Sequence, residues 1–579
     1  MAIVDDGCGP SINSGKLVFM KTKLRMLTTG LFLVACTILS SAVFSVTALA
    51  KESLVIGITQ FPATFHPSIN AMMAKTYILA MTRRPMTAYD ADWNLVCMLC
   101  VTVPTIENGL AVRETTPEGG DGVAITFTIR PDATWGDGVP VSSKDVVFTW
   151  QVGRHPKTGI SSAELYRRIL KIDEVDEKTF TLHVDRLTFD YNDLGGLDLL
   201  PEHIERINFS DPEAYRNKTA YDTDTLNEGL YHGPYVVVGV EIGSHVVLER
   251  NPMWKGTRPQ FDRIVVRVVE NTAALEANLV SGSLDMIAGE LGLSLDQAIS
   301  FDKRHGAKYR VLYQSGLIYE HIDLNLDNPI LTDVRVRRAL VHAIDREAIS
   351  AQLFAGRQPT ARSNVNPLDR VFASDVPGLN YDPKKAAQLL RDAGWGTMKN
   401  GVRVNERGDT LTLEFMTTAG NRTRELVQQV LQSQWKSLGI RVKIINQPAR
   451  VFFGETLDQR KYTGLGMYAW ISSPESVPRT TLHSAYVPSA NNGYEGQNYT
   501  GFQNTEVDGL LDAIEVELDF EKRRALWRRL QEIYVNEVPV IPLFFRANAF
   551  LLPTWLQGIK PTGHQYPTTL WIENWKVVP

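Results

Sequence analysis

The sequence predicts an α/β fold made of more than one domain. Its 579 residues are more than a single hydrophobic core usually organises. In the second half of the chain a helical apolar stripe leads directly into an alternating strand, which is typical of α/β wrapping with parallel strand pairing. No low-complexity linker divides the chain, so we expect the domains to exchange strands instead of hanging on a tether.

The composition is that of a folded globular protein, and it restricts the partners. Hydrophobic residues make up 44% of the chain and charged residues 22%, which is ordinary for a globular protein. The formal net charge is −5. Because neither sign of charge dominates, the composition argues against nucleic acid or an anionic membrane as the main partner.

The first fifty residues have the pattern of an export signal. A short basic run, Met20–Arg25, precedes the almost uncharged stretch Leu27–Val46, and Ala48–Ala50 supplies small residues at the spacing that a signal peptidase needs. We therefore predict that residues 1–50 are a signal peptide, with 1–19 as an over-extended start, and that the mature protein is periplasmic.

Two alternatives remain open for this segment. Leu33–Cys36 resembles a lipobox, which would make Cys36 a lipid-bearing first residue, although the stretch after it stays apolar where a lipoprotein usually has a polar tether. Leu27–Leu49 is also long enough to span a bilayer as an uncleaved anchor. No later segment of the sequence is long and apolar enough to cross a membrane, so we expect a soluble mature body.

Only two cysteines, Cys97 and Cys100, follow the predicted signal. Export into an oxidising compartment favours a local disulfide between them, and two buried thiols are the alternative. Two ligands cannot complete a zinc site. The pair therefore predicts a structural role.

Secondary-structure signals are clear in the first half of the chain. Leu54–Ile58 is a short apolar strand, and Ile125–Ile129 alternates as a half-buried strand should, after a strand expected around Ala111–Glu114. Ser142 with Asp145 three positions later has the pattern of a capping box, so we expect a helix to begin there.

Two later helices also have clear start or stop signals. Asp382 can cap a helix in which Pro383 takes the first position. Its apolar stripe comprises Ala386, Leu389, Leu390 and Ala393, and Gly394 ends it. A second helix is expected over Thr423–Leu438, followed by a strand over Ile440–Ile444. We expect the core-facing side of this second helix to carry Leu426, Val430 and Trp435.

The sequence lacks the common motifs of catalytic sites. The sequence has no Gly-rich phosphate loop ending in Lys-Ser or Lys-Thr, no H-E-x-x-H helix and no G-x-S-x-G elbow. The histidines are scattered without metal-ligand spacing, and we interpret His66, His183, His232 and His321 as surface or core residues. The pair Asp190 and Asp193 is interpreted as solvated surface. We predict no catalytic residue, no metal and no cofactor.

Several aromatic residues lie in sequence that is rich in turn formers. Each one alone is best explained by core packing, but together they suit a ligand cleft, which combines apolar walls with a few fixed polar groups. These residues are Tyr468, Trp470, Tyr494, Tyr499, Phe502, Phe544 and Phe545.

Four stretches together resemble one known family, the family 5 extracellular solute-binding proteins of peptide-type ABC importers. The segment Phe127–Phe148 is similar to the family's signature. The other stretches are Gly233–Tyr235 with Leu248–Trp254 and Ser281–Asp285, Asn325–Pro329 with Asp333–Leu340 and Ala343–Arg346, and Tyr381–Ala386 through Trp395. With Pro539–Leu543, the resemblance covers essentially the whole chain after residue 50.

The resemblance implies a two-lobed periplasmic binding protein-like fold with a strand hinge and an extra subdomain in the first lobe. In this sequence we place the first segment of lobe I at 51–84, the extra subdomain at 85–231 and the second segment of lobe I at 232–315. Lobe II is placed at 316–542, and 543–579 returns to lobe I.

The resemblance also implies a function. The chain is expected to capture a peptide or peptide-like solute by hinge closure and to deliver it to an ABC permease in the inner membrane, as a monomer and without catalysis. The alternatives are a non-peptide solute, such as an opine, an oligosaccharide or another small molecule, and an exported hydrolase of the same shape. A chaperone or chemosensory role on the same fold is a further alternative.

The expected ligand-binding residues follow from the same comparison. In oligopeptide-binding members a Trp-x-x-Asp segment supplies an aspartate for the peptide's amino terminus, and here Ser473 stands in that place, with Glu475 as a substitute carboxylate two residues on. Arg362 is a candidate partner for a carboxylate, and a plain surface arginine is the alternative. The predicted set is Ala469, Trp470, Ile471, Ser473, Arg362, Phe545 and Arg546.

Overall fold

The computed structural model describes residues 51–579, apart from 70–71, 161–162, 449–450, 493–495 and 579. The interpretations of residues 1–50 as a signal peptide, of Cys36 as a lipid site and of Tyr494 as a cleft residue lie outside the described residues. Within the described part, no helix has the length and apolar character needed to cross a membrane.

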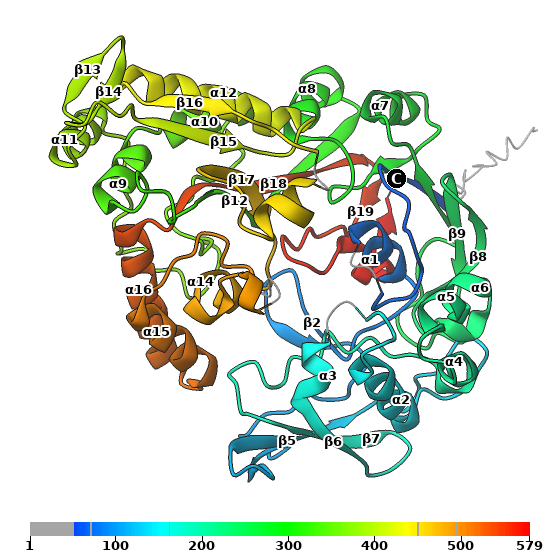
Figure 1. Cartoon of the computed structure of the whole chain (residues 1–579). Coiled ribbons are helices and arrows are strands. Elements are labelled where there is room, and N and C mark those ends of the chain that lie inside the picture. Colours follow the sequence, from blue (N-terminus) through cyan, green and yellow to red (C-terminus); the bar gives the residue numbers. More distant parts are fainter. Residues whose placement is uncertain (1–50, 70–71, 161–162, 449–450, 493–495, 579) are drawn as a thin grey trace, which may run out of the picture. The chain divides into compact units, whose positions relative to one another are not determined.

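One sheet of ten strands organises most of the chain (Figure 1). It contains strands that lie far apart in the sequence, as the absence of a linker predicted. In spatial order the strands are β16 (Arg441–Ile444), β15 (Thr412–Met416), β17 (Leu465–Trp470), β12 (Tyr309–Leu324), β18 (Val540–Pro553), β11 (Met286–Ile287), β1 (Ser53–Ile58), β10 (Arg263–Val268), β9 (His245–Arg250) and β8 (Tyr235–Glu241).

One end of this sheet is built around β1, the strand predicted at Leu54–Ile58. It pairs in parallel with β10 on one side and β11 on the other, and β8, β9 and β10 form an antiparallel meander. Its core includes helix α1 (Met73–Leu79), several tyrosines and the indole of Trp575. Helix α7 (Thr272–Val280) connects β10 to β11.

The other end of the sheet carries the predicted parallel pairing. β15 pairs in parallel with both β16 and β17, which confirms the α/β wrapping expected there. A second hydrophobic core joins these strands to the helices around them. Those helices are α8 (Leu295–His305), α9 (Val334–His342), α10 (Arg346–Phe354), α11 (Pro383–Asp392) and α12 (Arg422–Ser437).

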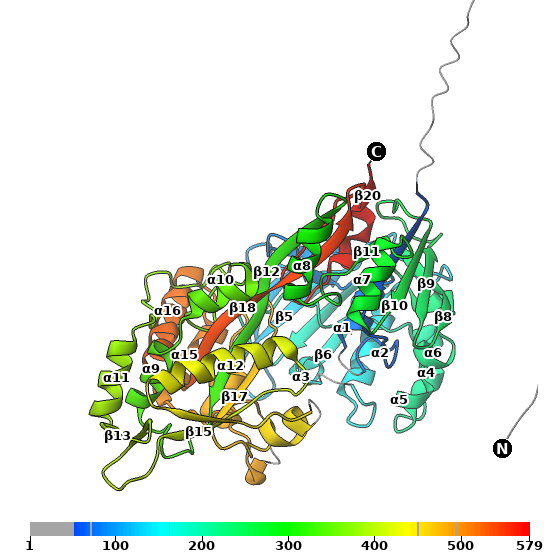
Figure 2. The same ribbon diagram turned by 90° about the horizontal axis from the view of Figure 1, so that it is seen from above.

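Two long strands connect the ends of the sheet. β12 has 16 residues and β18 has 14, and Figure 2 shows them running side by side. The antiparallel register shifts between the pairs Ser315–Ala547 and Tyr319–Phe545. Three residues of β12 therefore lie opposite Arg546 alone, and such a bulge bends the ladder.

A separate four-stranded antiparallel sheet is formed within the segment predicted as the extra subdomain. Its order is β4 (Ala111–Thr115), β5 (Asp121–Thr128), β7 (Thr179–Val184) and β6 (Ile169–Glu174). It has its own core with helix α2 (Ser143–Arg154). The capping box predicted from Ser142 and Asp145 is present at the start of α2.

The remaining elements are short, apart from two helices near the C-terminus, α15 (Thr505–Val516) and α16 (Phe520–Glu537), which pack into a fourth cluster. The short helices are α3 (Glu164–Arg168), α4 (Glu202–Phe209), α5 (Tyr215–Lys218), α6 (Ala220–Thr223) and α14 (Arg479–Leu482). The short strands are β2 (Thr87–Tyr89), β3 (Leu95–Cys97), β13 (Thr397–Lys399), β14 (Val402–Val404), β19 (Leu556–Gln557) and β20 (Lys576–Val577). A disulfide joins Cys97 to Cys100.

The predicted helix at Pro383 is confirmed. On the predicted face of α12, Trp435 is buried and Val430 packs against the core, but the placement of Leu426 is wrong. Asp382 accepts the backbone N–H of Lys385, and Ala386 and Leu390 are buried. In α12 the buried apolar residues are Val427, Leu431 and Trp435, whereas Leu426 is 38% exposed. Positions 427, 431 and 435 repeat every four residues along one face, while 426 lies one residue, about 100° around the helix, away from it.

Two of the predicted aromatic groups also lie in strands instead of turns. Tyr468 and Trp470 belong to β17, and Phe544 and Phe545 belong to β18. All of them except Trp470 are buried. Core packing therefore explains most of this group.

The close packing at the β12 bulge can be tested by substitution of Gly316. Gly316 lies in the bulge, and a Cβ at this position would collide with the backbone of Gly563, whose carbonyl accepts the Leu317 N–H at 2.7 Å. We expect Gly316→Ala to lower the free energy of unfolding by about 1–3 kcal/mol, because the backbone must move apart. Denaturant titration measures the change.

The matched control is Gly509→Ala. Gly509 is exposed in α15 with open space around its Cα, so the same substitution there should stabilise the protein by about 0.5–1 kcal/mol. Equal changes in the free energy of unfolding for the two substitutions would contradict the predicted collision at Gly316.

Candidate functional site

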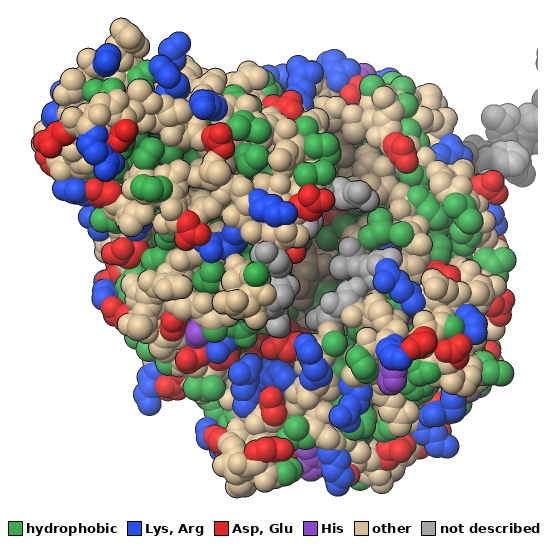
Figure 3. Space-filling model, in the orientation of Figure 1, with side chains coloured by type: hydrophobic (Ala, Val, Ile, Leu, Met, Phe, Trp, Pro, Cys, Tyr) green, Lys and Arg blue, Asp and Glu red, His purple; other side chains and the backbone are tan. Residues whose placement is uncertain are grey.

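A pocket of about 180 Å³ opens beside the second half of β12. Figure 3 shows a hollow near the centre of the same face of the molecule, in the region where Figure 1 has α14 and β17 on one side and α1 on the other. The pocket is lined by Leu317, Tyr319, His321, Asp323, Asn364, Trp470, Ile471, Ser472, Ser476, Val477, Pro478, Thr480, Thr481, Leu482, Gln497, Tyr534 and Val540. One water needs only about 10–15 Å³ of such volume, so the pocket has room for several waters or for a group of a small ligand.

The floor of the pocket is one face of β12. Side chains alternate between the faces of a strand, so Tyr319, His321 and Asp323 point to the pocket while the intervening residues point to the opposite face. All three are buried. The Tyr319 and His321 rings stack with centroids 4.9 Å apart, and the Tyr319 hydroxyl lies 3.0 Å from that of Tyr534.

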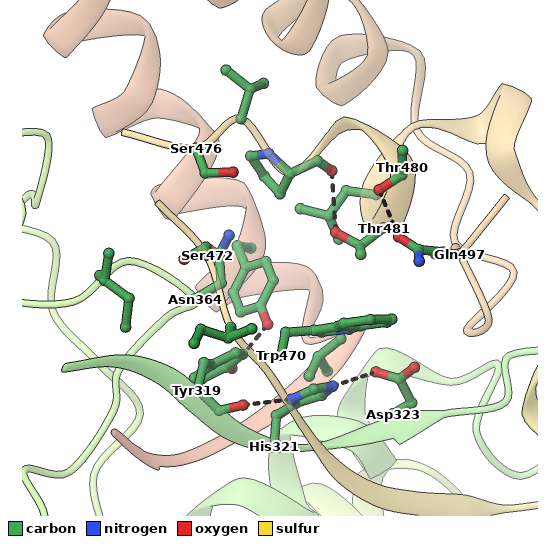
Figure 4. A pocket seen from close by; sticks show the side chains of 17 residues that line it. Tyr319, His321, Asp323, Asn364, Trp470, Ser472, Ser476, Thr480, Thr481 and Gln497 are labelled. Atoms are coloured by element: carbon green, nitrogen blue, oxygen red, sulfur yellow. Dashed lines mark hydrogen bonds and ion pairs between the residues drawn. The ribbon is translucent and has the colours of Figure 1, made fainter. Parts of the chain in front are cut away.

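His321 and Asp323 are linked in a chain of polar contacts (Figure 4). His321 Nδ1 lies 3.1 Å from the carbonyl oxygen of Tyr319, and its Nε2 lies 3.4 Å from Asp323 Oδ1. The hydroxyl of Tyr468 donates to Asp323 Oδ2 at 2.5 Å. A carbonyl oxygen can only accept, so His321 Nδ1 carries the hydrogen in its contact with Tyr319.

The walls of the pocket combine an indole with uncharged polar groups. Trp470 extends over His321 and Asp323 in Figure 4, and its ring stacks on Tyr499 with centroids 6.2 Å apart. Asn364 Oδ1 is buried and has no hydrogen-bond partner among the described residues, so it is an acceptor that a bound group could satisfy. The other uncharged polar side chains of the wall are Ser472, Ser476, Thr480, Thr481 and Gln497.

Charge in the pocket is confined to one pair. Among the described lining residues only His321 and Asp323 bear acid or imidazole groups, and they face each other. An ionic group of a ligand would therefore find no free counter-charge there, and a buried unpaired charge is costly. The pocket is suited to a neutral group that donates or accepts hydrogen bonds.

The loop after β17 is held from behind by Glu475. This residue is buried and has a positive φ of 53°, a conformation that costs energy for a residue with a side chain. Its carboxylate accepts Arg370 Nε at 3.0 Å and Arg523 Nη2 at 3.1 Å. Its backbone N–H donates to Asp369 Oδ2 at 2.8 Å. The strained loop is thus fixed by three partners.

The structure brings only part of the predicted site together. Trp470 and Ile471 line the pocket. Ala469 is paired with Glu320 in the ladder of β17 and β12. Ser473 follows the lining residue Ser472 but is not among the lining residues itself.

The other predicted residues lie elsewhere. Phe545 is buried beside Tyr319 on the same face of the β12–β18 ladder, with ring centroids 5.4 Å apart, and is not among the lining residues. Arg546 Nη2 lies 2.5 Å from Glu320 Oε2 on the opposite face of β12. Arg362 lines a separate cavity of about 10 Å³, which is no larger than a single water. A ligand-binding role for these three residues stays a prediction.

The ion pair behind β12 has a clear electrostatic cause. Arg424 Nε lies 2.7 Å from Glu320 Oε1, opposite the Arg546 contact. Burial alone would raise the pKa of Glu320, but the two guanidinium groups outweigh it and hold that pKa below its ordinary value. The carboxylate therefore stays ionised, and it is paired with Arg424 and Arg546 on the face of β12 that points away from the pocket.

Sequence reasoning missed most of the pocket residues, among them the three polar residues His321, Asp323 and Asn364. It assigned His321 to the core or the surface, and nothing in it singled out Asp323 or Asn364. The alternation of Tyr319, His321 and Asp323 with apolar Ile322 and Leu324 was an available signal for a strand with a polar face. Asn364 lies in a loop and carries no such signal. No group of three or more His, Cys, Asp or Glu side chains in the described part of the chain is arranged to hold a metal ion.

Comparisons with known proteins agree on one family. The sequence model of the bacterial extracellular solute-binding proteins, family 5 Middle, matches residues 105–492. The oligopeptide-binding protein AppA of Bacillus subtilis is 24% identical over 560 residues, covering 93% of this chain and 96% of AppA.

Two solved structures extend the comparison. The oligopeptide-binding protein of Thermus thermophilus, complexed with a pentapeptide, is 29% identical with a TM-score of 0.73, covering 91% of this chain and 96% of its own. NikZ of Campylobacter jejuni, in complex with Ni(L-His), is 21% identical with a TM-score of 0.73, covering 91% and 99%. The second of these likenesses concerns the fold alone.

Asp369 accepts a hydrogen bond from the pocket loop, and its ionisation should make the free energy of unfolding depend on pH. Burial raises the pKa of Asp369 from 3.8 to about 6. Because the folded-state pKa is the higher one, the stabilising contribution is complete below about pH 4 and is lost as the pH rises through about 6. We expect this group alone to lower the free energy of unfolding by roughly 2 kcal/mol between pH 4 and pH 7.

The measurement is denaturant unfolding across that pH range for the wild type and for Asp369→Asn. The variant cannot titrate at this position, so its stability should change less with pH than that of the wild type. Asp92→Asn, which alters an exposed carboxylate, is the control and should follow the wild type. Parallel curves for the wild type and Asp369→Asn would refute the assignment.

Proposed function

Because the chain belongs to the bacterial extracellular solute-binding proteins, family 5, we propose that its pocket receives one neutral group of a peptide or peptide-like solute. The family resemblance and the α/β periplasmic binding protein-like fold predicted from the sequence are both confirmed. The observation that carries the proposal is the pocket beside β12, in which Trp470 and uncharged hydrogen-bonding groups surround a space of about 180 Å³.

The similar proteins support a peptide-like solute. AppA is named as an oligopeptide-binding protein, and the Thermus thermophilus structure contains a pentapeptide. An indole face with hydroxyl and amide groups provides both dispersion contacts and hydrogen bonds to such a ligand. Relatives on the same fold also bind other solutes, such as the nickel–histidine complex of NikZ.

The residues around Ser473 indicate that the solute presents no free ammonium group here. Ser473 stands where oligopeptide-binding members place an aspartate. The nearby carboxylate of Glu475 cannot replace it without giving up Arg370 and Arg523. Releasing a buried carboxylate from two guanidinium partners is unfavourable. We therefore favour a solute with a blocked or absent amine, such as a modified peptide, an opine-like compound or an oligosaccharide.

In the proposed transport cycle the protein binds the solute and releases it without converting it chemically. A solute that contacts both parts of the protein binds the closed form better than the open one, and this difference in affinity shifts the equilibrium toward closure. In this proposal the protein is exported to the periplasm, acts as a monomer and hands the unchanged solute to an ABC permease. Nucleic acid is not a partner.

The direct test is a thermal-shift assay of the protein against defined pools of free peptides, N-acetylated peptides, opines and oligosaccharides. A ligand at 100 times its Kd stabilises the folded state by about 2.7 kcal/mol, which is a readily measured rise in Tm. Mass spectrometry of the pool follows the ligand. A chemically altered ligand would favour the hydrolase alternative, and no shift with any pool would refute the proposal.

Ser473→Asp is expected to change ligand preference. The new carboxylate supplies the missing partner for an ammonium group, so affinity for peptides with a free amino terminus should rise by about tenfold relative to their N-acetylated forms. Isothermal titration with matched pairs of tetrapeptides measures the ratio. Ser210→Asp, at an exposed position away from the pocket, adds the same charge and should leave the ratio unchanged. An unchanged ratio in Ser473→Asp would rule out this position as the site of amine recognition.

A further inference from the structure

The segment that follows β7 reaches from the four-stranded sheet to the turn between α15 and α16. The backbone N–H of Phe189 donates to the carbonyl of Glu515 at 2.9 Å. Arg186 Nη2 lies 3.7 Å from the Glu515 carboxylate, and Leu518 packs against the core of the four-stranded sheet. More than 300 positions separate these segments in the sequence, so this contact joins two parts of the chain that have separate cores.

Arg523 is the centre of this contact. Its guanidinium lies 4.4 Å from the centroid of the Phe189 ring and 5.5 Å from that of Phe520. Its Nη1 donates to the carbonyls of Glu517 at 2.9 Å and Leu518 at 3.3 Å. Arg523 is only 6% exposed, and a guanidinium–ring contact is stronger when it is shielded from water.

The same guanidinium also holds the pocket loop. Its Nη2 donates to Glu475 Oε2 at 3.1 Å, and Glu475 lies between the lining residues Ser472 and Ser476. Its positive φ needs external support. A continuous path of direct contacts therefore runs from the pocket loop through Glu475 and Arg523 to Phe189.

We propose that Arg523 is a positioning residue that couples the pocket loop to the docking of the four-stranded sheet on α15 and α16. When Phe189 docks, it covers the guanidinium and strengthens the ion pair that fixes the loop. When Phe189 leaves, Arg523 and Glu475 gain water, and the loop loses part of its support. The inference rests on the proposed function, since it links solute capture to the contact between the two parts, which is present in the structure without solute.

Hydrogen–deuterium exchange of the protein without added solute tests the coupling. Phe189→Ala removes the ring from Arg523, and none of the contacts described for Phe189 involves residues 470–478. We expect amides in 470–478 to exchange about fivefold faster than in the wild type. Phe189→Tyr keeps an aromatic face and should restore the wild-type rate. Val175→Ala, at an exposed position near the same sheet, should also exchange like the wild type.

Coupling of this kind must be reciprocal. Glu475→Gln weakens the ion pair inside the loop, so it should accelerate exchange in 186–191, although Glu475 has no direct contact with that segment among the contacts described. The proposal is overturned if Phe189→Ala leaves 470–478 at the wild-type rate. It is equally overturned if Glu475→Gln leaves 186–191 unchanged or if Val175→Ala reproduces the effect of Phe189→Ala.

A second measurement separates this proposal from the function on which it rests. A mixture of N-acetylated tripeptides to pentapeptides is titrated into the wild type and Phe189→Ala, and dissociation is followed by stopped-flow tryptophan fluorescence. We expect the variant to release the peptides about fivefold faster with little change in the association rate. Equal dissociation rates contradict the coupling. If the wild type binds no peptide while the exchange effect is present, the proposed solute class is wrong and the coupling stands.

Discussion

The pairing of β12 with β18 is the constraint on which the rest of the structure depends. These two strands are the longest of the ten-stranded sheet within the part that the structure describes, with 16 and 14 residues, and both contribute side chains to the two cores that the sheet shares. The register shift around Gly316 bends the pair, and Asn366 stabilises the bend by donating to the Gly316 carbonyl at 2.7 Å. The pocket floor begins directly after this bend, so the crossing and the pocket share one strand.

Burial of charge explains why the pocket itself is nearly neutral. Glu320 and His321 are neighbours on β12, yet they face opposite sides of the sheet. Glu320 is neutralised by Arg424 and Arg546 on one side, and His321 meets Asp323 on the other. A buried ion is tolerated only when its partners are fixed. Because these charges are satisfied within the chain, the pocket offers a bound group mainly its shape and its neutral hydrogen-bonding side chains.

Sequence reasoning succeeded where the signal is local. The cap at Ser142 and Asp145 involves residues three positions apart, and so does the cap of Asp382 on Lys385. It failed for α12, where Leu426 and Val427 are adjacent apolar residues and only the packing of the finished helix selects the second. Trp470 was found through a family motif, but Asn364 reaches the pocket from a loop that no periodicity describes.

Glu475 shows most clearly why a binding site cannot be completed from neighbouring residues in sequence. Two positions after Ser473, it has the right chemistry to replace a missing carboxylate, and the sequence offers no reason to reject it. Its actual partners, Arg370 and Arg523, are 105 and 48 positions away, and both donate to its carboxylate. A carboxylate is available to a ligand only if the fold leaves it unpaired. Here the fold uses it to support the pocket loop, so the carboxylate nearest to the motif holds its neighbours in place instead of facing the pocket.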